Sequence, residues 1–162
     1  MKLAQYLRAH PVQFDLRTHF HTGNSLQSAK ATQVPPGCLA KAVVLEDDDA
    51  RMVMAVLPAS RKLNLEELRS RTGRKLRLAK EDELRERFDD CEPGAVPPIG
   101  RAYDMETILD DSLLVQPELY FEAGDHETLV HLNTSDFARL LEGAPHMAFS
   151  APTREERSRP LF

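Results

Sequence analysis

The spacing of apolar and polar positions predicts a chain that mixes short strands with short helices. Apolar and polar side chains alternate over residues 12–20 (VQFDLRTHF), which is typical of a half-buried strand. Two apolar runs, residues 38–45 (CLAKAVVL) and 51–58 (RMVMAVLP), flank the short polar turn 46–50 and predict a hairpin. Further short strands are expected at residues 76–79, 105–109, 119–123 and 128–132.

Helices are predicted where a capping residue precedes a run without proline or glycine. Asn24 or Ser25 can cap a helix over residues 24–31, and Asn64 can cap one that ends at Gly73. The other expected helices are residues 3–10, 81–88 and 135–142, with a brief turn or helix at 111–114. Because strands and helices do not alternate strictly, we expect an α+β (mixed α/β) fold: a mixed, largely antiparallel curved sheet or barrel flanked by helices.

The length of 162 residues favours one domain, which we assign to residues 1–145. Residues 146–162 show no periodicity and are expected to be an irregular tail. No apolar run approaches the roughly 18 residues of a membrane span, and the charged N-terminus lacks a signal core, so we expect a cytoplasmic protein. The two cysteines, Cys38 and Cys91, lie far apart and are expected to be free thiols used for packing.

The net charge of −5 argues against a protein that coats nucleic acid in general. The charge is uneven, because residues 61–80 contain eight basic side chains, including Arg71 and Arg74, and only two acidic ones. Such a segment could contact a few phosphates, or it could be a solvated helix face.

The stretch CEPGAVPPIG, residues 91–100, cannot form a helix or a central strand. Its three prolines lack amide donors and its two glycines relax the backbone. Yet Ala95, Val96 and Ile99 are apolar, which a merely flexible linker would not need. The composition therefore predicts a stiff, apolar loop in the middle of the domain.

Lys41 is the only charged residue inside the apolar run 38–45. If this strand belongs to the core sheet, the lysine is costly unless its ammonium reaches a phosphate, a carboxylate or a water-filled pocket. If the strand lies at a sheet edge, the lysine can point outward and discourage aggregation. The pattern alone leaves both possibilities open.

No metal or other cofactor is expected. Three consecutive aspartates at 47–49 diverge around a turn, and His19 and His21 share a strand face without further ligands at a suitable spacing. The chain also lacks a nucleophile elbow, a Walker loop and a dinucleotide fingerprint.

The order of CLAKAVVL, RMVMAVLP, LRLAKEDEL, CEPGAVPPIG, ILDDSLL and YFEAGDHETLVHL resembles the YbaK / prolyl-tRNA-editing family of aminoacyl-tRNA deacylases, over about residues 34–141. The resemblance implies hydrolysis of the ester between a wrong amino acid and its tRNA, either in trans or within a synthetase. The implied partners are the tRNA 3′ acceptor end and an aminoacyl-tRNA synthetase, with no cofactor.

The resemblance also assigns residues. It matches the family's essential lysine to Lys41, its GxxxP loop to residues 94–98 with Gly100 closing the turn, and its acidic position to Asp110 or Asp111. A histidine present in some subfamilies corresponds to His126. Relatives that edit alanine often have asparagine after the lysine, whereas this chain has Ala42, which puts alanyl specificity in doubt.

Such a site would position a water and stabilise the oxyanion with backbone amides, here those of Gly94, Ala95 and Val96. Lys41 would hold a phosphate or the ester carbonyl, or act as a base if its pKa were lowered. His126 could orient water or a ribose hydroxyl, or simply face solvent.

The remaining candidates would bind substrate rather than react with it. Pro97 and Pro98 would stiffen the loop, and apolar walls including Ile99 would suit a small amino acid (alanine, serine, threonine or cysteine). Thr22 could line the pocket mouth, and Asp110 could cap the following turn or take part in the site. Arg71 and Arg74 are candidate contacts to the acceptor stem.

Two other functions fit the same residues. A non-catalytic module could keep the pocket to bind an RNA end or a nucleotide. A hydrolase of another small acyl ester would keep the loop but would not need the basic segment.

Overall fold

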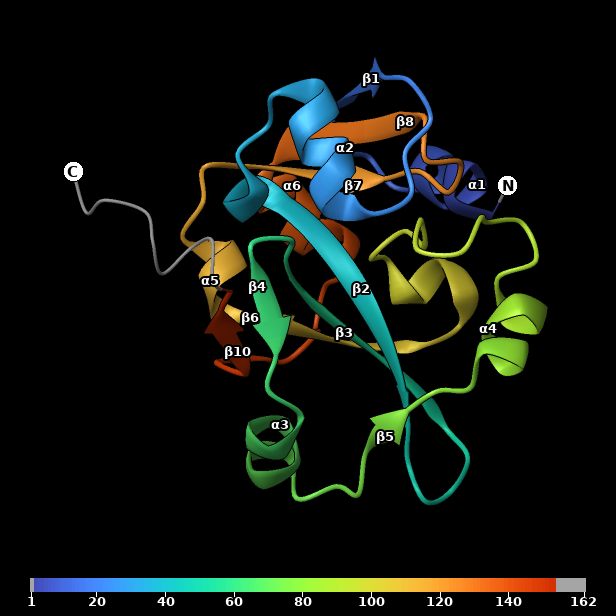
Figure 1. Ribbon diagram of the computed structural model, residues 1–162, viewed down its shortest axis with the longest axis vertical. Coiled ribbons are helices and arrows are strands. Elements are labelled where there is room, and N and C mark those ends of the chain that lie inside the picture. The colour runs from blue at the N-terminus through green and yellow to red at the C-terminus, as the bar shows by residue number, and fades with distance from the viewer. Residues whose placement is uncertain (1, 154–162) are drawn as a thin grey trace.

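The computed structural model describes residues 2–153 (Figure 1). Its helices are α1 (Lys2–Ala9), α2 (Ser25–Thr32), α3 (Leu65–Thr72), α4 (Glu81–Arg87), α5 (Asp111–Leu114) and α6 (Thr134–Leu140), with 3-10 turns η1 (Pro36–Cys38) and η2 (Gly100–Tyr103). Its strands are β1 (Phe14–Thr18), β2 (Leu39–Glu46), β3 (Met52–Pro58), β4 (Arg61–Leu63), β5 (Arg77–Leu78), β6 (Glu106–Asp110), β7 (Glu118–Glu122), β8 (Thr128–Asn133), β9 (His146–Met147) and β10 (Ser150–Pro152).

Eight strands form one mixed sheet, in the order β1-β8-β7-β2-β3-β6-β9, with β5 added to the end of β2. The pairs β2–β7, β3–β6 and β6–β9 are parallel and the others are antiparallel. The predicted α+β (mixed α/β) class is confirmed, and among the described residues the sheet is open rather than a closed barrel. No helix in this part of the chain is both long and apolar enough to cross a membrane.

The predicted hairpin is confirmed as β2 and β3, which pair from Ala40–Pro58 to Glu46–Met52. Asp47 closes the turn by accepting hydrogen bonds from the amides of Asp49 and Arg51. Since β2 lies between β7 and β3, Lys41 is not on an edge strand.

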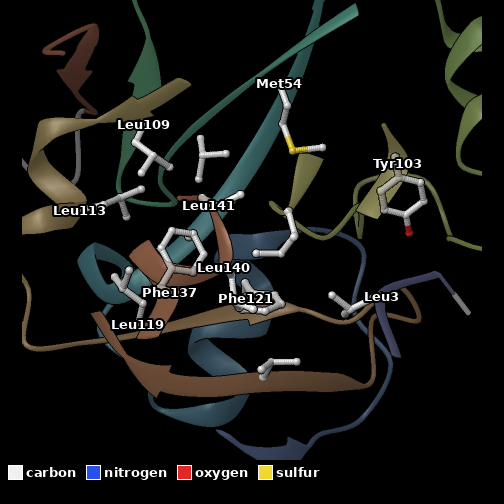
Figure 2. Packing of buried hydrophobic residues seen from close by; sticks show 14 of the residues in the cluster. Leu3, Met54, Tyr103, Leu109, Leu113, Leu119, Phe121, Phe137, Leu140 and Leu141 are labelled. Atoms are coloured by element: carbon white, nitrogen blue, oxygen red, sulfur yellow. The ribbon is translucent and has the colours of Figure 1, made fainter. Parts of the chain in front are cut away.

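The main core lies on one face of this sheet, where α1 and α6 pack. Figure 2 shows Phe121 of β7, Phe137 of α6 and Leu3 of α1 in the same cluster as Met54 of β3. All four side chains are almost completely buried. Apolar burial on both faces makes the central hairpin a rigid base for the residues at its ends.

The sheet opens beside Lys41. Strands β2 and β7 pair only at Leu39–Tyr120 and Ala40–Phe121, so Lys41 and Glu122 each come directly after the last residue of their strand in this pairing. Beyond this point β2 has no β7 partner, and β5 joins it only at Leu45 and Glu46. The gap between strands is therefore where a ligand can approach the sheet.

Two segments differ from the sequence-based expectation. Strand β1 is exposed along its whole length rather than half-buried, because it pairs only with β8 at the sheet edge. Part of the expected irregular tail is ordered: β9 pairs with β6, β10 pairs with β4, and Phe149 between them is buried. Residues 154–162 of the expected tail lie outside the described residues.

Candidate active site

A cavity of about 260 Å³ lies at the opening beside β2. Five separate parts of the chain form its walls, and they meet only in the folded protein. These are residues 24–26 at the start of α2, residues 40–42 of β2, the nearby Ala59, Gly94 and Val96 of the loop 91–100, and Glu122 at the end of β7.

Lys41 is the only cation in this lining. Within residues 2–153 it makes no hydrogen bond or ion pair, and burial lowers the pKa of its ammonium group. A partly buried ammonium without a partner costs free energy of folding unless a ligand supplies one. The side chain is therefore suited to hold a phosphate or a polarised carbonyl oxygen.

The loop 91–100 contributes Gly94 and Val96 to the lining of the same cavity. Gly94 has φ +79°, in the left-handed region that favours glycine. The Ala95 amide donates to the Glu92 carbonyl oxygen at 3.0 Å and is not available to a ligand. The Gly94, Val96 and Ile99 amides have no hydrogen-bond partner among the described residues, and of these three residues Gly94 and Val96 line the cavity.

The rest of the loop is an anchor rather than a wall of the cavity. Pro97, Pro98, Ile99 and Gly100 are buried beneath it. The Gly100 amide donates to the Thr107 hydroxyl at 3.1 Å, and a Cβ at Gly100 would clash with that oxygen. Only glycine fits there, and its close packing fixes the far end of the loop.

His126 holds the near end of the loop. Its Nε2 lies 2.6 Å from the Pro93 carbonyl oxygen, which can only accept, so Nε2 carries the proton. No peptide bond in the described part of the chain is cis, so the Pro93 carbonyl and the Gly94 amide point in opposite directions. By binding the carbonyl, His126 directs the Gly94 N–H away from itself.

A buried polar network connects this loop to α2. Glu122 accepts a hydrogen bond from the Ser28 hydroxyl, which in turn lies 2.6 Å from the Thr22 hydroxyl. His126 Nδ1 is 3.8 Å from Glu122 Oε1. Thr22 is thus behind the cavity wall rather than at the pocket mouth.

Sequence reasoning missed Glu122. The available signal was a carboxylate at the end of the apolar run LYFE, one step past the last residue that pairs with β2. Recognising it requires the β2–β7 register, which no local pattern gives.

The sequence and the fold both resemble those of known proteins. A family model described as the aminoacyl-tRNA editing domain matches residues 20–140. The chain belongs to this family. The match spans the helix, strands and loop that line the cavity, so the cavity lies within the editing domain itself.

Solved structures show the same fold at low sequence identity. The hypothetical protein APE2540 superposes with a TM-score of 0.82 at 21% identity, over 93% of this chain and all of that one. A proposed trans-editing enzyme for prolyl-tRNA synthetase gives 0.81 at 21% identity, over 93% and 95%. A proposed signal transduction protein from Marinobacter aquaeolei VT8 gives 0.74 at 22% identity, over 93% of this chain but only 30% of its own. A comparison with curated proteins gives no match.

Asp110 of the editing domain supports the fold next to α5. Its carboxylate accepts hydrogen bonds from the amides of Ser112 and Phe149 and from the Ser150 hydroxyl, at 3.2, 2.9 and 2.8 Å. Asp110 does not line the cavity. It caps α5 and ties down the segment that carries β10.

Arg71 and Arg74 also lie away from the cavity. Figure 1 shows α3 and β5 at the opposite end of β2 from α2. Arg74 is 2.9 Å from both Asp47 and Glu106, and Arg71 is 2.8 Å from Glu67. The structure therefore does not bring these two arginines together with Lys41, and their contact with the acceptor stem stays a prediction.

The histidines of the strand 12–20 region take other roles in the editing domain. His21 Nε2 is 2.6 Å from Glu92 Oε2, at the start of the loop, and this hydrogen bond raises the pKa of His21. His19 Nδ1 contacts the Phe20 carbonyl oxygen at 2.7 Å. Within residues 2–153 no group of three or more histidine, cysteine or acidic side chains is placed to hold a metal ion.

Proposed function

We propose that this editing domain is an aminoacyl-tRNA deacylase that hydrolyses, in trans, the ester of tRNA mischarged with a small amino acid (alanine, serine, threonine or cysteine). The observation that supports this most directly is one cavity lined by the unpaired ammonium of Lys41 and the free amides of Gly94 and Val96. A cation and two preorganised donors around one small space are what ester hydrolysis requires.

The reaction needs no covalent intermediate, because an aminoacyl ester is already activated. Water attacks the ester carbonyl, and the oxyanion that develops accepts hydrogen bonds from Gly94 and Val96. The ribose oxygen then leaves with a proton that comes from the attacking water. Lys41, as a fixed ammonium, holds the terminal phosphate or the carbonyl oxygen and thereby places the ester against the loop.

His126 acts on this reaction indirectly. Its bond to the Pro93 carbonyl at 2.6 Å sets the direction of the Gly94 amide, so we assign it a positioning role. Amides fixed before the substrate arrives require no reorganisation during the reaction, and loss of one such donor typically costs about 3 kcal/mol of transition-state stabilisation.

Cavity size supports a small amino acid. The walls include Ala40, Ala42, Ala59 and Val96, and the volume of the cavity is about 260 Å³. Such walls exclude large side chains by size but separate side chains one methylene apart by only about 1–3 kcal/mol. Discrimination among alanine, serine, threonine and cysteine therefore depends on a few contacts between the cavity wall and the side chain of the amino acid.

The test is a panel of tRNAs charged with alanine, serine, threonine, cysteine or proline, in which loss of the ester is followed for the wild type and for Lys41→Ala. We expect one or more small amino acids to be released by the wild type, at a rate that falls at least about 100-fold in the variant. Release that is unchanged in Lys41→Ala would remove the lysine from the mechanism. Measurable binding of the tRNA end without release of any amino acid would instead indicate a non-catalytic module.

A further inference from the structure

Among the described residues, Glu122 is the only carboxylate that lines the cavity, and it is 2% exposed. One of its oxygens, Oε1, accepts the hydrogen bond from Ser28. The other, Oε2, is buried and has no hydrogen-bond partner among the described residues. The deacylation chemistry set out above makes no use of this group.

Among the described residues, no lysine or arginine pairs with Glu122. Burial raises the pKa of its carboxyl group, with partial opposition from Ser28, His126 and His19. His126 Nδ1 lies 3.8 Å from Oε1, which is beyond hydrogen-bond reach. A buried carboxylate oxygen left without a donor costs free energy, and a ligand that brought a cation would recover that cost.

The positions of Lys41 and Glu122 together indicate which charges a ligand of this cavity must carry. Each of the two residues directly follows the last residue of its strand in the β2–β7 pairing, and both line the same cavity, yet they form no ion pair. A ligand that meets both groups in this one small cavity must carry a negative or electron-rich atom and a positive group close together. A free α-ammonium next to an ester carbonyl has this arrangement.

We propose that Glu122 receives the α-ammonium group of the aminoacyl ester and makes the site selective for acyl groups with a free α-amino group. The inference rests on the proposed deacylase function and deepens it. An ester whose amino group is acylated, as in N-acetyl-alanyl-tRNA, lacks the charge and would leave Glu122 unpaired. Such esters would be rejected even when their side chain fits the cavity.

Binding of two non-hydrolysable compounds tests this directly. The probes are 3′-(alanylamino)-3′-deoxyadenosine and its N-acetyl derivative, measured by calorimetry at pH 7, where most α-amino groups are protonated. We expect the wild type to bind the free-amine compound about 10- to 100-fold more tightly, the range typical of a hydrogen bond to a charged group. In Glu122→Gln, which keeps the acceptor for Ser28, the two compounds should bind within about threefold of each other.

Glu118→Gln is the matched control, since Glu118 lies on the same strand but contacts His131 rather than the cavity. It should keep the wild-type preference. Thermal melts of both variants distinguish a folding defect from a change in recognition. Equal affinity of the two compounds for the wild type, a preference that survives in Glu122→Gln, or no binding of either compound would each overturn the inference.

Hydrolysis separates this inference from the proposed function. Alanyl-, seryl-, threonyl- and cysteinyl-tRNA are compared with their N-acetyl forms. If both forms are hydrolysed equally, the deacylase assignment stands and the role of Glu122 is wrong. If no ester is hydrolysed but the free-amine compound is still preferred, the deacylase assignment fails and Glu122 remains an ammonium-binding residue.

Discussion

The two ends of β2 treat charge in opposite ways. At the α2 end, Lys41 and Glu122 line one cavity without contacting each other. At the other end, Glu46 and Asp47 are each 2.9 Å from an arginine, Arg77 and Arg74 respectively. The second end holds more basic residues and its buried carboxylates are paired with them, whereas at the first end, among the described residues, no carboxylate pairs with Lys41 and no lysine or arginine pairs with Glu122.

This difference separates structural charges from candidate functional ones. The paired charges at the second end satisfy each other, and this pairing is what allows the carboxylates of Glu46 and Asp47 to be buried. Unpaired charges in a partly buried cavity reduce stability, and a fold retains them most readily where a ligand completes them. A cluster of basic residues in the sequence is therefore a weak indication of a binding site. A stronger indication is a charged residue that has no ionic partner in the structure.

Replacement of Lys41 by methionine should have the largest effect, and it should reduce activity without reducing stability. We expect single-turnover deacylation to fall at least about 100-fold, while the free energy of unfolding stays the same or rises by about 1 kcal/mol, because an unpaired, partly buried ammonium is removed. Hydrolysis assays and urea denaturation of the same preparations measure the two effects. A loss of stability parallel to the loss of activity would show that Lys41 is a packing residue.

The pH dependence of stability provides an internal control for that variant. Burial lowers the pKa of Lys41, so between this lowered value and the ordinary 10.5 the unfolded chain binds more protons than the folded one. The free energy of unfolding of the wild type should therefore gain a positive contribution as pH rises through that window. The Lys41→Met protein should lack this contribution.

Replacement of an arginine at the Glu46 end of β2 should reduce stability and leave activity unchanged. Arg74→Gln breaks the contacts with Asp47 and Glu106, and because Arg74 is about a quarter exposed we expect a loss of less than about 2 kcal/mol of stability. Single-turnover deacylation should be unchanged. A rate that falls with no change in melting temperature would place Arg74 in the reaction and contradict the comparison.

Arg71→Glu tests the predicted acceptor-stem contact without that loss of stability, since Arg71 is exposed and paired only with Glu67. If the contact exists, KM for charged tRNA should rise about threefold, and the dependence of binding on salt should weaken by about one phosphate contact. An unchanged KM and salt dependence would remove the basic segment from the proposed interface.

The sequence was sufficient for features that depend on local pattern. The hairpin, the caps at Asn24 and Asn64 and the stiff loop 91–100 follow from residue types at short spacing. Glu122 could not be found in this way, because its importance depends on a strand register set by tertiary packing. The ordered strands β9 and β10 were likewise missed, because they are held by distant partners such as Asp110 rather than by their own periodicity.

Loop residues show the same limit within one motif. The sequence predicts amide donors at Gly94, Ala95 and Val96 alike, since none of these residues is proline. Only the structure shows that the Ala95 amide is already bonded to the Glu92 carbonyl. Which donor is free depends on how the loop turns, and that turn is set by contacts with His126 and Gly124 from another part of the chain.

The smallest expected effect concerns His21, which joins the cavity end of the molecule to the loop through Glu92 at 2.6 Å. This hydrogen bond raises the pKa of His21, and the nearby acids Glu127 and Asp125 add to the effect. The contact therefore stabilises the loop fully below the ordinary pKa of 6.5 and is lost as pH rises through the raised value.

We expect the hydrogen-exchange protection factor of the Glu92 amide, which donates to Gly124, to fall about two- to threefold across that rise in pH. In His21→Ala the protection factor should be low at both pH values, and deacylation should change by less than about threefold, because His21 is exposed and does not line the cavity. A loop whose protection is the same in both proteins at every pH would show that the other contacts, those of His126 and Gly100, hold it alone. The ion pair between His21 and Glu92 would then make no contribution to the order of the loop, and the charged groups of the cavity would act only on the ligand.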